Sequence, residues 1–189
     1  MDEELTRSCL RWLTAGMPDD IRPELTDDRD YQPLGIDQVG DVAVVAVLRW
    51  WNGPPGHSSA PPETQARRPF ALADVRRFCK PEGTWLPLGG GGGPAPDYPL
   101  APRRASRALG GHVRVKGTGR TLAEPLGYDM MHAHLLVSAE VAHLRVADRE
   151  LDVPFHGNVF VVWSAQDPVP VVVASDTDGI ALAEMEISG

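Results

Sequence analysis

The sequence has little cysteine, few aromatic residues and no long apolar run. Its 189 residues include two cysteines, Cys9 and Cys79, which excludes a framework of several disulfides. The longest apolar run, from Val42 to Leu48, has the length of a strand and is too short for a membrane span. The acidic N-terminus lacks the basic start and apolar core of a secretory signal. These absences predict a cytoplasmic protein with reduced thiols and no membrane association.

Helix-breaking residues are abundant instead, with 19 glycines and 18 prolines. Long helices should therefore be scarce. One helix is expected at the N-terminus, because Leu5, Cys9 and Trp12 recur at helical spacing and Gly16 follows them. Residues 41–51 are rich in valine and predict a buried strand, and 70–78 with 85–88 predict a hairpin. The polar segment 19–38, which carries proline and glycine, is expected to be a loop.

Short β-type runs separated by turn residues fill the last third of the chain. This spacing predicts an antiparallel sandwich or a small barrel, and its strand–turn rhythm is similar to that of immunoglobulin-like modules. The predicted fold class is mainly β, with α+β character at the N-terminus only. Five consecutive glycines, Gly89 to Gly93, are followed by a proline-rich stretch and suggest a division of the chain. We expect a helix with antiparallel strands over 1–88, a linker or long loop over 89–107, and a sandwich-like part over 108–189.

The charge is arranged in three blocks that together give a net charge of −8. Residues 1–66 carry −7, residues 67–120 carry +8, and residues 121–189 carry −9. The simpler explanation is that the basic block neutralises the acidic blocks within the fold. The alternative is that it forms a binding surface, in which case steep salt dependence is expected. The candidate binding residues are its six most C-terminal cations: Arg103, Arg104, Arg107, Arg114, Lys116 and Arg120.

Two histidines provide the sharpest chemical signal. His132 and His134 lie two apart in a predicted strand and should share a face, which Glu140 joins if the strand continues that far. Together with Gly127 they loosely resemble the first metal motif of cupins, although the spacing departs from that motif by a residue or two. The resemblance implies a divalent transition metal such as Fe(II), Mn(II), Zn(II) or Ni(II), with His156 as a further candidate ligand.

The competing hypothesis treats these histidines as ordinary residues on the outer face of a half-buried sheet. Ala133, Leu135 and Val137 form an apolar set of opposite parity, which would face the core. Leu136 also shares the histidine face, where it would intrude on a metal cluster. This hypothesis places both rings in solvent and requires no cofactor.

No pattern in the chain pairs a nucleophile with its base, so a non-catalytic interaction or regulatory protein is the leading hypothesis. Its partner would be another protein, bound through loops and the basic block, since the net acidity argues against nucleic acid. A cupin-like metal-binding protein or metal enzyme is the second hypothesis. An anion or nucleotide binder that uses the basic block is the third.

Overall fold

The computed structural model describes residues 3–18, 31–51, 70–95 and 98–187. The fold is mainly β, with an N-terminal helix followed by antiparallel sheets that remain open, as the sequence predicts apart from the barrel alternative. Helix α1 (Glu3–Ala15) buries Leu5, Cys9 and Trp12, the stripe seen in the sequence. No helix in these ranges is long and apolar enough to cross a membrane.

Three sheets make up the body of the molecule. Sheet A contains, in chain order, β1 (Tyr31–Val39), β2 (Val42–Trp51), β3 (Phe70–Cys79) and β4 (Leu86–Pro94). Sheet B contains β5 (Val113–Ala123), β6 (Tyr128–Val137) and β9 (Asn158–Ser164). Sheet C has the order β11 (Ala181–Glu186), β10 (Val171–Ser175), β7 (His143–Val146) and β8 (Arg149–Leu151). Short helical turns occur at η2 (Pro81–Gly83), α2 (Ser106–Leu109) and η3 (Glu124–Leu126).

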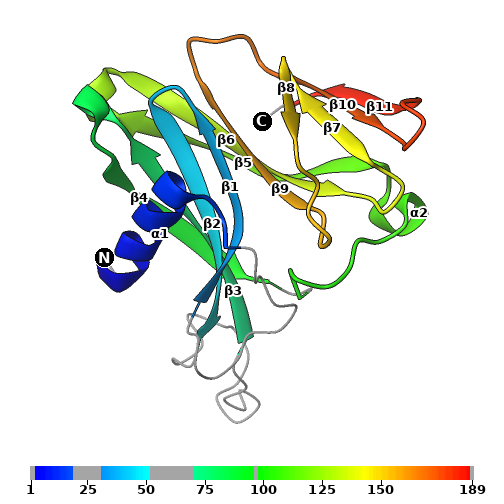
Figure 1. The fold of residues 1–189 in the computed structure, drawn as a ribbon, viewed down its shortest axis with the longest axis horizontal. Coiled ribbons are helices and arrows are strands. Elements are labelled where there is room, and N and C mark those ends of the chain that lie inside the picture. Colours follow the sequence, from blue (N-terminus) through cyan, green and yellow to red (C-terminus); the bar gives the residue numbers. More distant parts are fainter. Residues whose placement is uncertain (1–2, 19–30, 52–69, 96–97, 188–189) are drawn as a thin grey trace, which may run out of the picture.

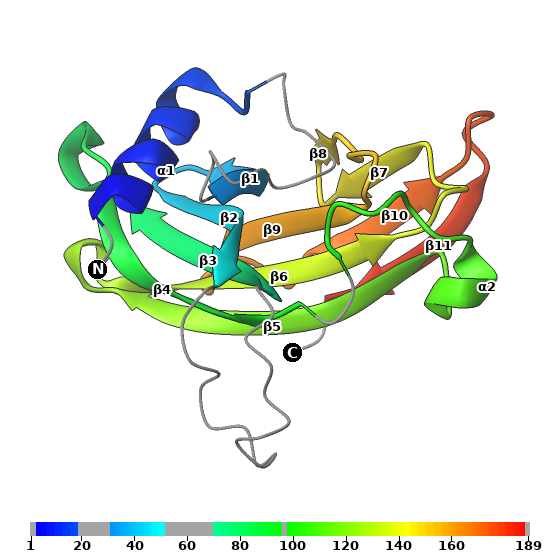
Figure 2. The same ribbon diagram turned by 90° about the horizontal axis from the view of Figure 1, so that it is seen from below.

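Sheet B is the middle layer, between sheet A and sheet C (Figure 1). Alternation along β9 shows this arrangement, since neighbouring side chains point to opposite faces. Phe160 and Val162 pack in one core cluster with residues of sheet A, whereas Val161 packs in another with residues of sheet C. Helix α1 covers the outer face of sheet A, where a third cluster forms (Figure 2). Both faces of sheet B are therefore covered over much of their area.

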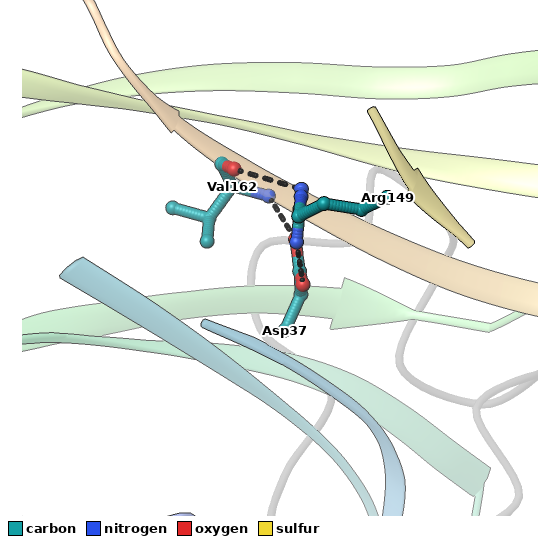
Figure 3. A network of polar contacts seen from close by, with 3 residues as sticks. All are labelled: Asp37, Arg149 and Val162. Carbon is teal, nitrogen blue, oxygen red and sulfur yellow. Dashed lines mark hydrogen bonds and ion pairs between the residues drawn. The ribbon is translucent and has the colours of Figure 1, made fainter. Parts of the chain in front are cut away.

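The free edge of β9 is closed by side chains instead of a neighbouring strand (Figure 3). The Val162 N–H donates to Asp37 Oδ2 at 2.7 Å, and Arg149 Nη1 donates to Asp37 Oδ1 at 2.6 Å. A second guanidinium nitrogen, Nη2 of Arg149, donates to the Val162 carbonyl at 3.5 Å. Asp37 comes from β1 and Arg149 from β8, so this network joins one strand of each sheet. An unpaired strand edge invites pairing with other chains, and the network occupies this one.

Two segments differ from the sequence-based expectation. The predicted loop over 19–38 is wrong from residue 31 onward, because Tyr31–Val39 forms β1. Pro33 and Gly35 are accommodated at a register shift, and a Cβ on Gly35 would lie 2.7 Å from the ring of Phe160. The glycine therefore marks a close approach between layers and not a turn. The start of that predicted loop, 19–30, lies outside the described residues.

The glycine run is also not a linker. Gly89 to Gly93 belong to β4 and pair with β3. They extend the predicted hairpin of 70–78 with 85–88, whose two strands also pair. The backbone ladder does not depend on side chains, and Gly92 approaches β3 so closely that a Cβ there would clash with the Ala73 carbonyl oxygen. Beyond β4, Leu100 is fully buried in the cluster between sheets A and B. The two halves thus share a core, while their division into domains stays a prediction.

Candidate functional site

Four of the six predicted basic residues line one cavity of about 310 Å³: Arg103, Arg104, Arg114 and Lys116. Arg114 and Lys116 have the same parity in β5, although the register with β6 shifts between Val115 and Gly117, at Lys116 itself. Arg107, exposed on α2, lies outside the lining, as does Arg120, whose Nε donates to Asp129 Oδ2 at 2.8 Å. We call this space the basic cavity.

The basic cavity forms where the connection between β4 and β5 crosses the sheet A side of sheet B. Its walls are residues 98–99, 101–104 and 108–109 of that connection, two residues of β5, the end of β6 and residues 156–158. Arg103 fixes the connection in place, since its Nη1 donates to the Val141 carbonyl at 2.6 Å and its backbone N–H donates to the Phe155 carbonyl. Gly157 has φ +69°, and a Cβ there would lie 2.8 Å from the Arg103 side chain. Glycine thus lets the turn approach Arg103 closely.

Asn158 organises the polar wall of the basic cavity. Its side-chain amide donates to the Pro99 carbonyl at 2.7 Å, which ties β9 to the β4–β5 connection. Its backbone N–H donates to His156 Nδ1 at 3.1 Å, and its Oδ1 lies 2.8 Å from His134 Nε2. A neutral His134 therefore carries its proton on Nε2 and donates it to Asn158. The same logic makes Nδ1 of His156 a bare acceptor.

His156 is the unusual group of this wall. Its side chain is buried, with 5% of the residue exposed, and burial lowers the histidine pKa to about 4. The ring is neutral at pH 7, and because Nδ1 accepts a hydrogen bond, the proton resides on Nε2. This Nε2 is buried and has no hydrogen-bond partner within the described part of the chain. A residue that lines the basic cavity thus has a buried neutral N–H donor without an acceptor among the described residues.

The lining of the basic cavity includes basic side chains but no acidic one among the described residues. Among the described residues that form it, there is no aspartate, glutamate, serine, threonine or cysteine. The rest of the wall includes Tyr98 and the apolar side chains of Leu109 and Leu136. The site offers positive charge, N–H donors, the phenol of Tyr98 and an apolar surface, but no carboxylate base among its described lining residues.

The predicted metal ligands are only partly brought together. His134 and His156 both contact Asn158, whereas Glu140 lies elsewhere, because β6 ends at Val137. Its carboxylate accepts hydrogen bonds from Ser106 N and Oγ. Hydrogen bonds from Ser138 and Ser106 hold the pKa of Glu140 down to about 2. Among the described residues, no group of three or more His, Cys, Asp or Glu is placed to hold a metal ion.

His132 and His134 do share one face of β6, opposite Ala133, Leu135 and Val137, but that face does not look into open solvent. It is turned toward sheet A, and the His134 ring stacks on Phe160 with the centroids 4.3 Å apart. Burial lowers the pKa of His134 to about 4, against the opposing effect of its hydrogen bond to Asn158. Burial, helped by the charge of Arg77, also lowers the pKa of His132. The expectation that both rings face solvent is therefore wrong.

Comparison with known proteins identifies no relative: no protein family, no curated protein and no solved structure matches this chain.

Sequence reasoning missed Asn158, which connects the histidines to the basic cavity. One signal was present, because asparagine is disfavoured in strands and here begins a run of buried apolar residues. A polar residue at such a position needs hydrogen-bond partners. The sequence does not indicate that one of its partners is the Pro99 carbonyl, 59 residues away in the chain.

Proposed function

We propose that this protein is a non-catalytic binding protein that holds an anionic group in the basic cavity. The observation that carries the proposal is that four cationic side chains line one cavity, whose wall also includes His156 with a buried Nε2–H that has no acceptor among the described residues. A buried donor without an acceptor costs about 1–3 kcal/mol. An anion entering the cavity would supply the missing acceptor and meet the surrounding charge.

The composition of the lining supports binding in preference to catalysis. The described lining residues have no serine or threonine hydroxyl, no thiol and no carboxylate, although Tyr98 and His156 are among them. This proposal joins the interaction hypothesis from the sequence to its anion-binding alternative. Small molecules and partner proteins both carry such anionic groups, and either would meet the same N–H donors.

Isothermal titration calorimetry with inorganic phosphate, sulfate and acetate at constant ionic strength tests the proposal. Wild type is compared with Arg114→Gln, which removes one charge from the basic cavity. Arg145→Gln is the matched control, because Arg145 is exposed on β7 and does not line the cavity. We expect at least one anion to bind and Arg114→Gln to weaken it about tenfold, a loss of about 1.4 kcal/mol.

Arg145→Gln should leave the affinity unchanged. The proposal is overturned if none of the three anions binds. It is also overturned if both variants weaken binding equally, because the effect would then reflect the overall charge of the protein and not the cavity.

A further inference from the structure

The donors of the basic cavity come from separate parts of the fold. Arg103 and Arg104 belong to the β4–β5 connection, Arg114 and Lys116 to β5, and His156 to the turn before β9. N–H donors that come from separate elements around a cavity suit an acceptor whose oxygens point in different directions. A phosphoryl group has three terminal oxygens and a charge of about −1.5 to −2 at pH 7. A carboxylate has two oxygens in one plane and a single charge.

The volume of the basic cavity exceeds what a bare phosphate requires. About 310 Å³ corresponds to roughly ten water molecules of liquid volume, whereas inorganic phosphate has only five heavy atoms. The rest of the space adjoins apolar side chains, including Leu109 and Leu136. Sites for small molecules commonly combine an apolar wall with a few polar groups that fix orientation.

We infer that the ligand of the basic cavity is a small organic phosphate monoester, with its phosphoryl group on the cationic side chains and its apolar body against Leu136. This inference rests on the proposed function and specifies its ligand. His156 Nε2–H donates to one phosphoryl oxygen. Asn158 is a positioning residue, since its backbone N–H holds the Nδ1 edge of the histidine ring.

The neutral state of His156 makes its contribution selective for an acceptor. With Nδ1 occupied by the Asn158 N–H, the ring presents only a donor at Nε2. A ligand that placed an N–H or O–H donor there would leave two buried donors facing each other. An ionised phosphoryl oxygen has no such proton, and its hydrogen bond to an N–H is charge-assisted.

The test uses four probes in calorimetric titrations at pH 7.5: phenyl phosphate, benzoate, inorganic phosphate and a hexaglutamate peptide. We expect phenyl phosphate to bind at least tenfold more tightly than any of the other three. Comparable affinity for benzoate would overturn the phosphoryl assignment but keep anion binding. Tighter binding of hexaglutamate would instead assign the cavity to an acidic protein partner. Failure of all four probes would remove both the inference and the proposed function.

Two substitutions of His156 separate its two nitrogens. In His156→Asn, the amide oxygen replaces Nδ1 as acceptor for the Asn158 N–H, but no donor reaches the place of Nε2. In His156→Gln, the amide nitrogen replaces the Nε2–H donor. We expect His156→Asn to weaken phenyl phosphate about tenfold and His156→Gln to stay within about threefold of wild type. Equal affinity of the two variants would overturn the role given to Nε2.

The apolar wall has a separate test that does not disturb this hydrogen-bond network. Leu136→Ala should weaken phenyl phosphate about threefold to tenfold and leave inorganic phosphate unchanged. Leu122→Ala is the matched control, because Leu122 is exposed on β5 and does not line the cavity. If Leu136→Ala weakens both phosphates equally, or neither, the apolar body does not lie where we place it.

Discussion

Replacing Asp37 by alanine should be among the most destabilising single substitutions in this chain. Asp37 is buried, and its two oxygens accept hydrogen bonds from Arg149 and from the Val162 backbone N–H. Asp37→Ala leaves the guanidinium of Arg149 and the edge of β9 without their acceptor. Breaking a buried ion pair by removing one partner costs about 3–5 kcal/mol.

The structure places the expected cost at the lower end of that range, because 27% of the Arg149 side chain remains exposed to water. We therefore expect Asp37→Ala to reduce the free energy of unfolding by about 3 kcal/mol. Asp37→Asn keeps an oxygen for the Val162 N–H but loses the charge, so we expect about 1–2 kcal/mol. In Asp37→Ala combined with Arg149→Ala, the loss should be less than the sum of the two single losses.

Urea denaturation at pH 7, followed by tryptophan fluorescence, measures these differences. The matched control is the Arg120–Asp129 ion pair, whose arginine is 68% exposed. Asp129→Ala should cost no more than about 1 kcal/mol, because exposed ion pairs contribute little. The reasoning is refuted if Asp37→Ala is as mild as Asp129→Ala, or if the double substitution is additive. Either result would mean that the network does not support the edge of β9.

Two further predictions concern the glycine strand and the buried histidines. Gly92→Ala should reduce the free energy of unfolding by about 1–3 kcal/mol, because its Cβ would meet the Ala73 carbonyl. Gly93→Ala, whose Cβ meets nothing within 4 Å, should be neutral or stabilising. Equal effects of the two substitutions in urea denaturation would contradict the pairing of β4. For His134 and His156 the folded pKa of about 4 lies below the unfolded value of about 6.5, so the unfolded chain binds more protons between these values. Stability should therefore fall as the pH drops from 6.5 to 4, and His134→Gln should flatten that decline in a series of thermal melts; an unchanged slope would contradict the buried neutral state of His134.

The elements that sequence reasoning predicted are those marked by a local pattern of apolar residues. Helix α1 has a helical period and strand β2 is a continuous apolar run, and the structure confirms both. Strands β1 and β4 carry proline and glycine, residues that are typical of loops, and local patterns therefore indicated the wrong structure. Both strands are held by pairing with sheet neighbours, and Gly35 fits because Phe160, distant in the chain, packs against it. Such contacts depend on the assembled layers and leave little trace in a window of ten residues.

The candidate site was predictable to the extent that it depends on charge and parity. Arg114 and Lys116 share a parity in β5, and a count of charges is enough to identify the basic block. What the sequence does not contain is the path of the β4–β5 connection, which brings Arg103 and Pro99 across sheet B. It also does not reveal that Arg120, toward the C-terminal end of β5, is paired with Asp129 of β6.

The face of β6 that carries His132 and His134 fits neither hypothesis from the sequence, the metal site or the solvent-facing histidines. Alternation establishes that His132 and His134 oppose Ala133 and Leu135, and the structure has that parity. The assumption that one face of an antiparallel strand meets solvent holds for a two-layer sandwich. In sheet B a second layer covers the other face as well, so polar side chains there must find partners inside the fold. Asn158 is such a partner for His134, whereas the buried Nε2–H of His156 has no partner among the described residues.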